Sequence, residues 1–238
     1  MTHARAWLAA PPPRLLPSQS EERSFLIEAF QLRYAQNLLA AFSLYLALAS
    51  GIARATEAPA VVETLHAALL ASMQAGAITT EARAERLRPV INASFDFPTI
   101  ARVVLGRTWG TLDDAERERF LSVFADLSVA TYAARFDSFT DERFVTLGSE
   151  PGRREGEALV RTQLQRPASG KPPVSLHYLL RLDPVQGWRV VNVVADGVSD
   201  LSLKRTEYAA VLKEGGVAKL IERLEAQTLD LLDGKGAE

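Results

Sequence analysis

Residues 174–194 read VSLHYLLRLDPVQGWRVVNVV, and this stretch decides the fold. It contains two apolar-rich runs, 174–182 and 188–194, in which the side chains of one face recur at every second position. The segment Pro184-Val185-Gln186-Gly187 between them is typical of a turn. Because so short a connection joins antiparallel neighbours, the stretch predicts a β-hairpin.

The same two-residue period extends toward the N-terminus over residues 144–147 and 158–164. Turn-forming residues separate these runs, with Gly152 after the first and Gly170-Lys171-Pro172-Pro173 after the second. The sequence therefore predicts about four antiparallel strands that follow one another along the chain.

Outside this region, apolar residues recur with the period of a helix. Ser199 or Ser202 is expected to cap the first helix after the strands. Thr111 with Asp114 resembles a capping box for the longest helix. The expected helices cover residues 60–75, Thr79 or Thr80 to about Ser94, Asp96 to Gly106, about 112–138, about 203–214 and, after Gly215-Gly216, 217–232.

The order of these elements indicates the architecture. Helices, a meander of strands and then helices predict an α+β fold, a curved antiparallel sheet covered by helices. In the helix that ends near Ser94, Leu87, Val90 and Ile91 are expected on one face and the arginines on the other. A sheet covered in this way forms a half-open cone, whose interior is either filled by side chains or holds an apolar ligand.

Composition excludes several classes of function. The 238 residues carry a formal net charge of −2 and contain no cysteine. Nucleic acid is therefore not an expected partner, because phosphate binding needs a clustered basic face. The lack of cysteine excludes disulfides, thiolate metal sites and cysteine nucleophiles.

The N-terminal region predicts export. Residues 34–53 carry no charge, Arg33 precedes them, and Ala53-Arg54-Ala55 matches a cleavage site. Residues 1–55 are interpreted as a signal peptide with an unusually long segment before its apolar run, cleaved near Ala55, and residues 56–238 as one domain. The alternatives are an uncleaved anchor, since 20 uncharged residues can span a bilayer, and a start downstream of Met1.

Candidate catalytic groups are scattered. Ser199 lacks the Gly-x-Ser-x-Gly elbow of a nucleophile, and His66 and His177 have no spaced partner, so neither catalysis nor a metal site is expected there. The carboxylates of Asp96, Asp196 and Asp200 could act as a general acid and base in an isomerase-like cavity. Caps and turns explain each of them locally.

Two segments carry a resemblance to a known family. They are Phe95–Trp109, which begins FDFPTIAR, and Trp188–Ser199, which reads WRVVNVVADGVS. In this order and spacing they resemble the MlaC, or toluene-tolerance auxiliary, family of periplasmic lipid carriers, and the resemblance extends over about 61–231. Residues 196–205, DGVSDLSLKR, are similar to its hopanoid-associated HpnM branch.

The resemblance implies a nuclear-transport-factor-like or cystatin-like sheet with a helical cover that encloses lipid tails. It implies a phospholipid or hopanoid as cargo, with no cofactor and no reaction. The implied partners are an inner-membrane ABC transporter complex and an outer-membrane lipoprotein. A small cone-fold enzyme and a structural adaptor with a filled core are the alternative interpretations.

On this hypothesis the lipid-binding residues are apolar side chains on the long helix and the inner faces of the strands. Periodicity alone does not separate a lined cavity from a filled core. Val190 and Val194 are expected on one face with Trp188. The predicted lining is Val104, Phe120, Phe124, Leu127, Phe136, Leu164, Tyr178, Leu180, Trp188 and Val190.

Overall fold

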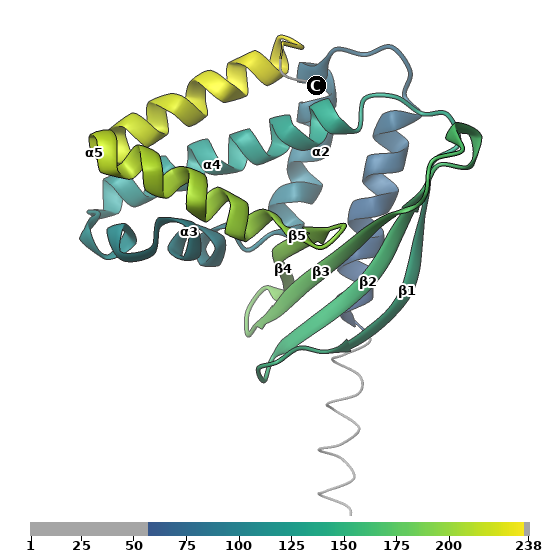
Figure 1. Cartoon of the computed structure of the whole chain (residues 1–238), viewed down its shortest axis with the longest axis horizontal. Coiled ribbons are helices and arrows are strands. Elements are labelled where there is room, and N and C mark those ends of the chain that lie inside the picture. The colour runs from purple at the N-terminus through teal and green to yellow at the C-terminus, as the bar shows by residue number, and fades with distance from the viewer. Residues whose placement is uncertain (1–56, 236–238) are drawn as a thin grey trace, which may run out of the picture. The chain divides into compact units, whose positions relative to one another are not determined.

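The computed structural model describes residues 57–235, which belong to one compact unit (Figure 1). The predicted signal peptide, residues 1–55, and its cleavage site lie outside the described residues. The predicted α+β class is confirmed: a sheet lies beside a group of helices, and both contribute to one hydrophobic core.

The sheet is an antiparallel meander in the order β1-β2-β3-β4-β5. The four predicted strands are all present, and a short fifth strand follows them. Of the four, the last three are one or two residues longer than expected, whereas the first has nine residues where four were expected. Their bounds are β1 Arg143–Pro151, β2 Glu157–Gln165, β3 Val174–Asp183, β4 Gly187–Ala195 and β5 Val198–Ser199.

The helices also follow the predicted order. The first described helix covers residues 57–73 and packs against the sheet, while α2, α3 and α5 contact β4 (Figure 1). Two short 3₁₀-helices, η1 and η2, were not predicted. The remaining bounds are α2 Thr80–Ser94, α3 Phe97–Leu105, η1 Gly106–Thr111, α4 Asp114–Arg135, η2 Pro167–Ser169 and α5 Asp200–Leu232.

The long helix α4 begins later than predicted. Its N-cap is Asp113, whose carboxylate accepts from the Glu116 amide at 2.8 Å, while the Glu116 carboxylate accepts from the Asp113 amide at 3.0 Å. The capping box is therefore Asp113 with Glu116, and the predicted pairing of Thr111 with Asp114 is wrong. Thr111 ends η1 instead, and its hydroxyl donates to the carbonyl oxygen of Thr108.

Helix α5 is kinked at the predicted glycine pair. Gly215 and Gly216 are non-helical, and Gly216 has φ 69° and ψ −164°, a backbone conformation that favours glycine. At the start of α5, the Ser199 hydroxyl accepts from the Ser202 amide, which settles the predicted choice between the two serines in favour of Ser199. The Asn192 side chain on β4 accepts from the Leu201 amide and the Ser199 hydroxyl, so it ties α5 to the sheet.

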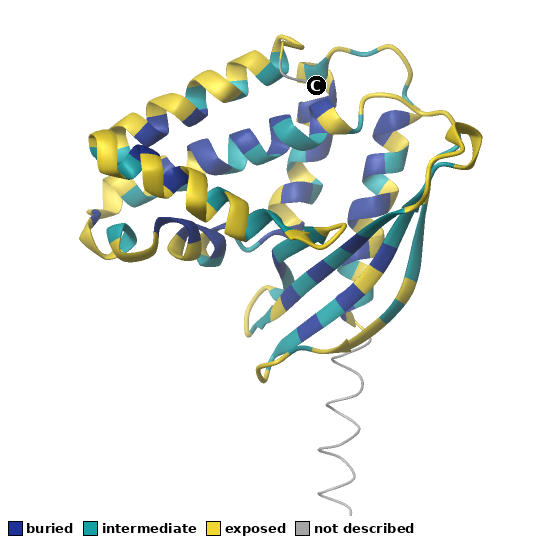
Figure 2. Ribbon diagram, viewed as in Figure 1, coloured by how far each residue is buried: buried dark blue, intermediate teal, exposed yellow. Residues whose placement is uncertain are grey.

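Burial follows the predicted period, as the alternating colours of the strands in Figure 2 show. One residue of α2 departs from the prediction. Arg83 is 3% exposed and buried like Leu87, although the arginines of this helix were expected on the face opposite Leu87. Its guanidinium donates to the carbonyl oxygens of Asp137 at 2.9 Å and of Ala133 and Ile78 at 3.4 Å. These acceptors lie at the end of α4 and in two loops, and they compensate for the loss of hydration.

A β-bulge shifts the inner face of β4. Leu179 pairs with Asn192, but Leu180 pairs with Val190, so Val191 is an additional residue in β4. Beyond the bulge Val193 pairs with Tyr178, and Val194 pairs with His177. Val194 therefore lies on the face opposite Val190, and the prediction that the two share a face is wrong.

Candidate functional site

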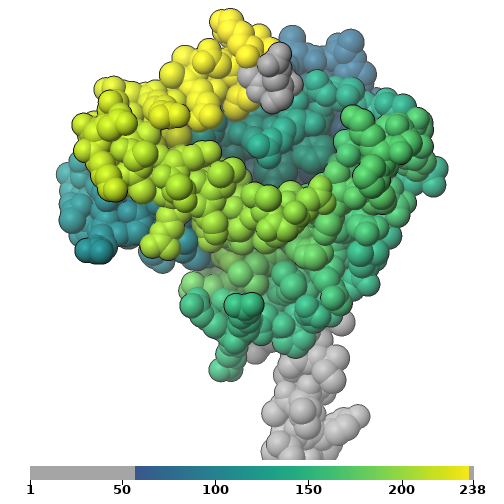
Figure 3. All heavy atoms as spheres, in the orientation of Figure 1, coloured from purple at the N-terminus to yellow at the C-terminus, as the bar shows by residue number. Residues whose placement is uncertain are grey.

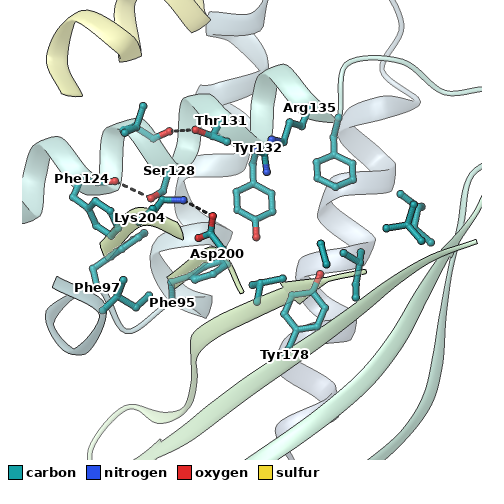
Figure 4. Close-up of a pocket in the computed structure, with 18 residues that line it drawn as sticks. Phe95, Phe97, Phe124, Ser128, Thr131, Tyr132, Arg135, Tyr178, Asp200 and Lys204 are labelled. Carbon is teal, nitrogen blue, oxygen red and sulfur yellow. Dashed lines mark hydrogen bonds and ion pairs between the residues drawn. The ribbon is translucent and has the colours of Figure 1, made fainter. Parts of the chain in front are cut away.

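A cavity of about 240 Å³ lies between α4, the inner face of the sheet and the first turns of α5. Figure 3 shows the surface hollowed between α5 and the strands, above α4, and Figure 4 shows the side chains inside. The cavity is mostly apolar. It is lined by Phe95, Phe97, Ile100, Phe124, Leu127, Ser128, Thr131, Tyr132, Arg135, Phe136, Leu164, Val174, Leu176, Tyr178, Val193, Ala195, Asp200 and Lys204.

Aromatic rings form a continuous wall along the cavity. Phe124 meets Phe97 edge to face at 5.8 Å between ring centroids, and Phe97 stacks on Phe95 at 5.9 Å. Phe95 contacts Tyr132 at 5.7 Å, and Tyr132 stacks on Phe136 at 5.9 Å. Each such pair contributes about 0.5–1.5 kcal/mol beyond its buried area. The wall is therefore held by its own contacts and offers a bound molecule few polar atoms.

Helix α4 supplies one stripe of the lining because residues three and four apart share a helix face. The stripe runs from Phe124 through Leu127, Ser128 and Thr131 to Arg135. The Ser128 hydroxyl donates to the carbonyl oxygen of Phe124 at 2.8 Å, and the Thr131 hydroxyl donates to that of Leu127 at 2.7 Å. These two hydroxyl protons are therefore directed to the helix backbone rather than to the cavity.

The opposite wall comes from the sheet, where residues two apart share a face. Val174, Leu176 and Tyr178 of β3 line the cavity together with one residue of β2 and two of β4. The hydroxyl of Tyr178 lies 2.9 Å from Nε2 of His66. The His66 ring stacks on Phe144, with 4.0 Å between the ring centroids. Burial lowers the pKa of His66 from 6.5 to about 4, so the ring is neutral at pH 7.

Three charged side chains line the cavity on either side of Tyr132 (Figure 4). Lys204 and Asp200 form an ion pair one turn apart on α5, with Nζ 2.5 Å from Oδ1, and Arg135 lies at the end of α4 (Figure 4). Burial, and then the negative charge of Asp200, raise the pKa of Tyr132, while Arg135 opposes the shift. The site therefore has an amphipathic lining.

The structure brings together half of the residues that sequence analysis placed in the lining. Phe124, Leu127, Phe136, Leu164 and Tyr178 line the cavity. The other five are buried in the surrounding core, at Val104, Phe120, Leu180, Trp188 and Val190. For all ten, contact with a lipid stays a prediction.

Local contacts explain why two of these five residues, Val190 and Phe120, lie outside the lining. The Val190 carbonyl accepts from the Asp96 amide at 3.0 Å, so this end of β4 packs under the junction of α2 and α3. The bulge at Val191 then separates Val190 from the part of β4 that reaches the cavity. Phe120 stacks on Phe124 one turn earlier in α4, at 5.7 Å. Sequence periodicity gave these residues the correct face but not their position along it.

Thirteen lining residues were missed, and some had a visible signal. Thr131, Tyr132 and Arg135 continue the helical spacing of Phe124 and Leu127 on α4. Phe95 and Phe97 were recognised only as parts of a family-like segment. Asp200 was considered as a general acid or base, and Lys204 as part of segment 196–205. No local pattern indicated that they line one cavity with Arg135.

The candidate catalytic groups have structural partners. The Asp96 carboxylate accepts from the Thr99 amide at 2.9 Å and caps α3, and Asp196 accepts from the Ser175 amide at 2.8 Å. Nε2 of His177 lies 3.0 Å from the Ser175 hydroxyl, and neither Asp96 nor His177 lines the cavity. Of the three aspartates considered as acid and base, only Asp200 does.

Neither a metal-binding cluster nor a membrane-spanning helix is found among the described residues. Within residues 57–235, no three His, Cys, Asp or Glu side chains gather in a way that could hold a metal ion. None of the helices in this part of the chain is both long and apolar enough to span a bilayer.

Comparison with known proteins identifies similar folds. The sequence model of a family described as MlaC protein matches residues 60–226. Among solved structures, a phospholipid-binding protein from Ralstonia solanacearum, determined in complex with a phospholipid, has a TM-score of 0.62 and 20% identity to this chain. That match covers 73% of this chain and 98% of the other. At this identity, the likeness shows a common fold.

Proposed function

We propose a function from one premise: the chain belongs to the MlaC protein family, whose model matches residues 60–226. The protein is a periplasmic carrier that encloses the acyl chains of a phospholipid in the cavity beside Tyr132. The structurally similar Ralstonia protein, which was determined with a phospholipid, supports this proposal. The single observation that carries it in this chain is the apolar, aromatic-walled cavity of about 240 Å³.

The energetics of acyl chains explain why a carrier is needed. Burial of each methylene group contributes about 0.8 kcal/mol, so a chain of about 15 carbons gains roughly 10 kcal/mol on leaving water. Free diffusion of such a lipid through an aqueous compartment is negligible. A lining of aromatic and aliphatic side chains shelters the tails without demanding one lipid structure, and transport requires no catalytic group.

The size of the cavity adds a requirement. Its volume of about 240 Å³ lies below the roughly 300–1,000 Å³ of pockets that enclose drug-sized ligands. Two acyl chains therefore enter only if the walls separate. We propose that the first half of α5 moves, because Asp200 and Lys204 on it line the cavity and the Gly215-Gly216 kink separates it from the second half.

The finer parts of the proposal come from family resemblance. The leader of residues 1–55 directs the protein to the periplasm, and the carrier exchanges lipid with an inner-membrane ABC transporter complex and an outer-membrane lipoprotein. Hopanoid is the second candidate cargo, favoured by the resemblance of residues 196–205 to the HpnM branch.

Native mass spectrometry of gently purified protein tests the function. The wild-type protein should retain phospholipid. Phe124→Asp, which places a charge in the aromatic wall, and Ala195→Phe, which fills the cavity from an exposed position on β4, should both lose it. Val185→Asp is the control, because Val185 is 92% exposed in a turn. Retention of lipid by a folded Ala195→Phe variant, or its absence from wild-type protein, would refute the proposal.

A further inference from the structure

The cavity lining carries a net positive charge. Of the 18 lining residues, three are charged at pH 7, the cations Arg135 and Lys204 and the anion Asp200 (Figure 4). Every other lining side chain is apolar, a hydroxyl or a phenol. A mostly apolar cavity with an excess cation in its lining is complementary to an amphiphile with an acidic head group.

Lys204 is held in the lining by a partner on its own helix. Its side chain is 21% exposed and pairs with Asp200, whose position in the first turn of α5 is favoured by the helix dipole. The pair therefore restricts the position of the ammonium group. Asp200 also occupies the position at which an incoming anion would meet Lys204, so it competes with such a ligand.

Arg135 has no such internal partner. In residues 57–235 its guanidinium makes no ion pair or hydrogen bond, although it lies in the last turn of α4 and lines the cavity. Its charge acts on the Tyr132 phenol in the direction opposite to that of Asp200. Tyr132 therefore lies within electrostatic range of both groups. An unpaired guanidinium can donate two parallel hydrogen bonds to the oxygens of a phosphate or carboxylate.

We propose that Arg135 and Lys204 form an anion subsite for the head group of the cavity ligand. The inference rests on the proposed function and names the class of lipid: an acidic amphiphile, whose phosphodiester or carboxylate oxygens replace Asp200 as the partner of Lys204. Neutral lipids lack these contacts. The subsite therefore favours an acidic phospholipid over a neutral polycyclic lipid such as a hopanoid.

Four variants separate this role from a structural one. Arg135→Gln and Lys204→Gln remove the proposed contacts, whereas Asp200→Asn removes the competitor and leaves Lys204 free. Lys219→Gln is the matched control, because Lys219 pairs with Glu214 on the same helix and does not line the cavity. Thermal unfolding of each variant checks that it is folded.

The probes are short-chain phosphatidylglycerol, diacylglycerol with the same chains, and hexadecanoate, with dissociation constants measured by calorimetry. Wild-type protein should bind phosphatidylglycerol about tenfold more tightly than diacylglycerol, a factor that corresponds to one charge-assisted contact. Arg135→Gln and Lys204→Gln should each remove most of that preference, and Asp200→Asn should increase it several-fold, whereas Lys219→Gln should match wild type. Added salt should reduce the preference.

The outcomes separate this inference from the proposed function. Tighter binding of phosphatidylglycerol than of hexadecanoate assigns the subsite to a phosphodiester, and the reverse order assigns it to a carboxylate. Equal binding of the charged and neutral glycerolipids overturns the subsite but leaves the carrier intact. Weaker phosphatidylglycerol binding by Asp200→Asn also overturns it, because the three residues would then act only as a scaffold. Failure of wild-type protein to bind any of the probes overturns both proposals.

Discussion

The hydroxyl of Tyr178 on β3 lies 2.9 Å from Nε2 of His66, although the two residues are 112 positions apart in the chain. His66 belongs to the helix of residues 57–73, so this hydrogen bond joins the first described helix to the wall of the cavity. Both residues are buried, His66 with 4% exposure and Tyr178 with 2%. The bond gives two polar groups a partner inside an otherwise apolar region.

Acid should weaken the fold through His66. Its pKa is lowered from 6.5 to about 4 in the folded state, so the folded protein takes up this proton less readily than the unfolded chain. The stability that neutral His66 contributes is complete above pH 6.5 and is lost as pH falls toward 4, by about 3 kcal/mol in total. Urea unfolding of wild type and His66→Gln across this pH range measures the change in the free energy of unfolding. Parallel pH profiles for the two proteins would refute the assignment to His66.

Tyr178→Phe should destabilise the protein by about 1–3 kcal/mol, because it leaves Nε2 of His66 buried without a partner. The ring remains, so the apolar lining is kept. A double-mutant cycle with His66→Gln, read by denaturant unfolding, isolates the pair. Additive effects of the two substitutions would show that the hydrogen bond contributes nothing.

Arg83→Met should reduce the free energy of unfolding by roughly 2–4 kcal/mol, since three carbonyl oxygens lose a buried donor. Arg86→Met on the same helix is the control, because Arg86 is exposed. Chemical denaturation compares the two. An equal, small effect of both substitutions would contradict the structural role assigned to Arg83.

Gly216→Ala should destabilise the kink of α5 by about 1–3 kcal/mol, because φ is +69° there and a side chain disfavours that conformation. Gly110→Ala has open space around its Cβ and no positive φ, so it should be nearly neutral. The comparison is made by differential scanning calorimetry. A melting temperature unchanged by Gly216→Ala would mean that α5 does not need the kink.

Asp113→Ala should lower the free energy of unfolding by about 1 kcal/mol, because it removes the N-cap of α4. Thr111→Ala should have a much smaller effect, since the Thr111 hydroxyl bonds only within its own 3₁₀ turn. Thermal melts of the two variants distinguish the observed capping box from the pairing expected on sequence grounds. A larger loss of stability in Thr111→Ala than in Asp113→Ala would favour the expected pairing of Thr111 with Asp114.

Several elements could be predicted from the sequence because their causes are local. The strand pair at 174–182 and 188–194 follows from alternation and a short turn, and the kink of α5 follows from Gly215-Gly216. The start of α4 was missed by a few residues because Thr111-Leu112-Asp113 offers two capping residues close together. Hydrogen-bond geometry, rather than residue type, chooses between them.

The candidate site was predicted only in part. Phe124, Leu127 and Tyr178 follow from periodicity, which identifies the inner face of a helix or strand. Leu180 and Val190 have the correct period but lie in the solid core. The sequence of a strand does not indicate which of its residues the covering helices contact and which border a cavity.

The order, type and inner faces of the helices and strands were determined by the sequence, through apolar period and chain-breaking residues. Only the tertiary structure decided where that inner face borders a cavity, which residue forms the bulge in β4, and that Arg135 lines the same cavity as Asp200 and Lys204. The physical reason is the distance along the chain over which each effect acts. Periodicity and capping act within a few residues, whereas a cavity is a gap between surfaces that belong to distant parts of the chain.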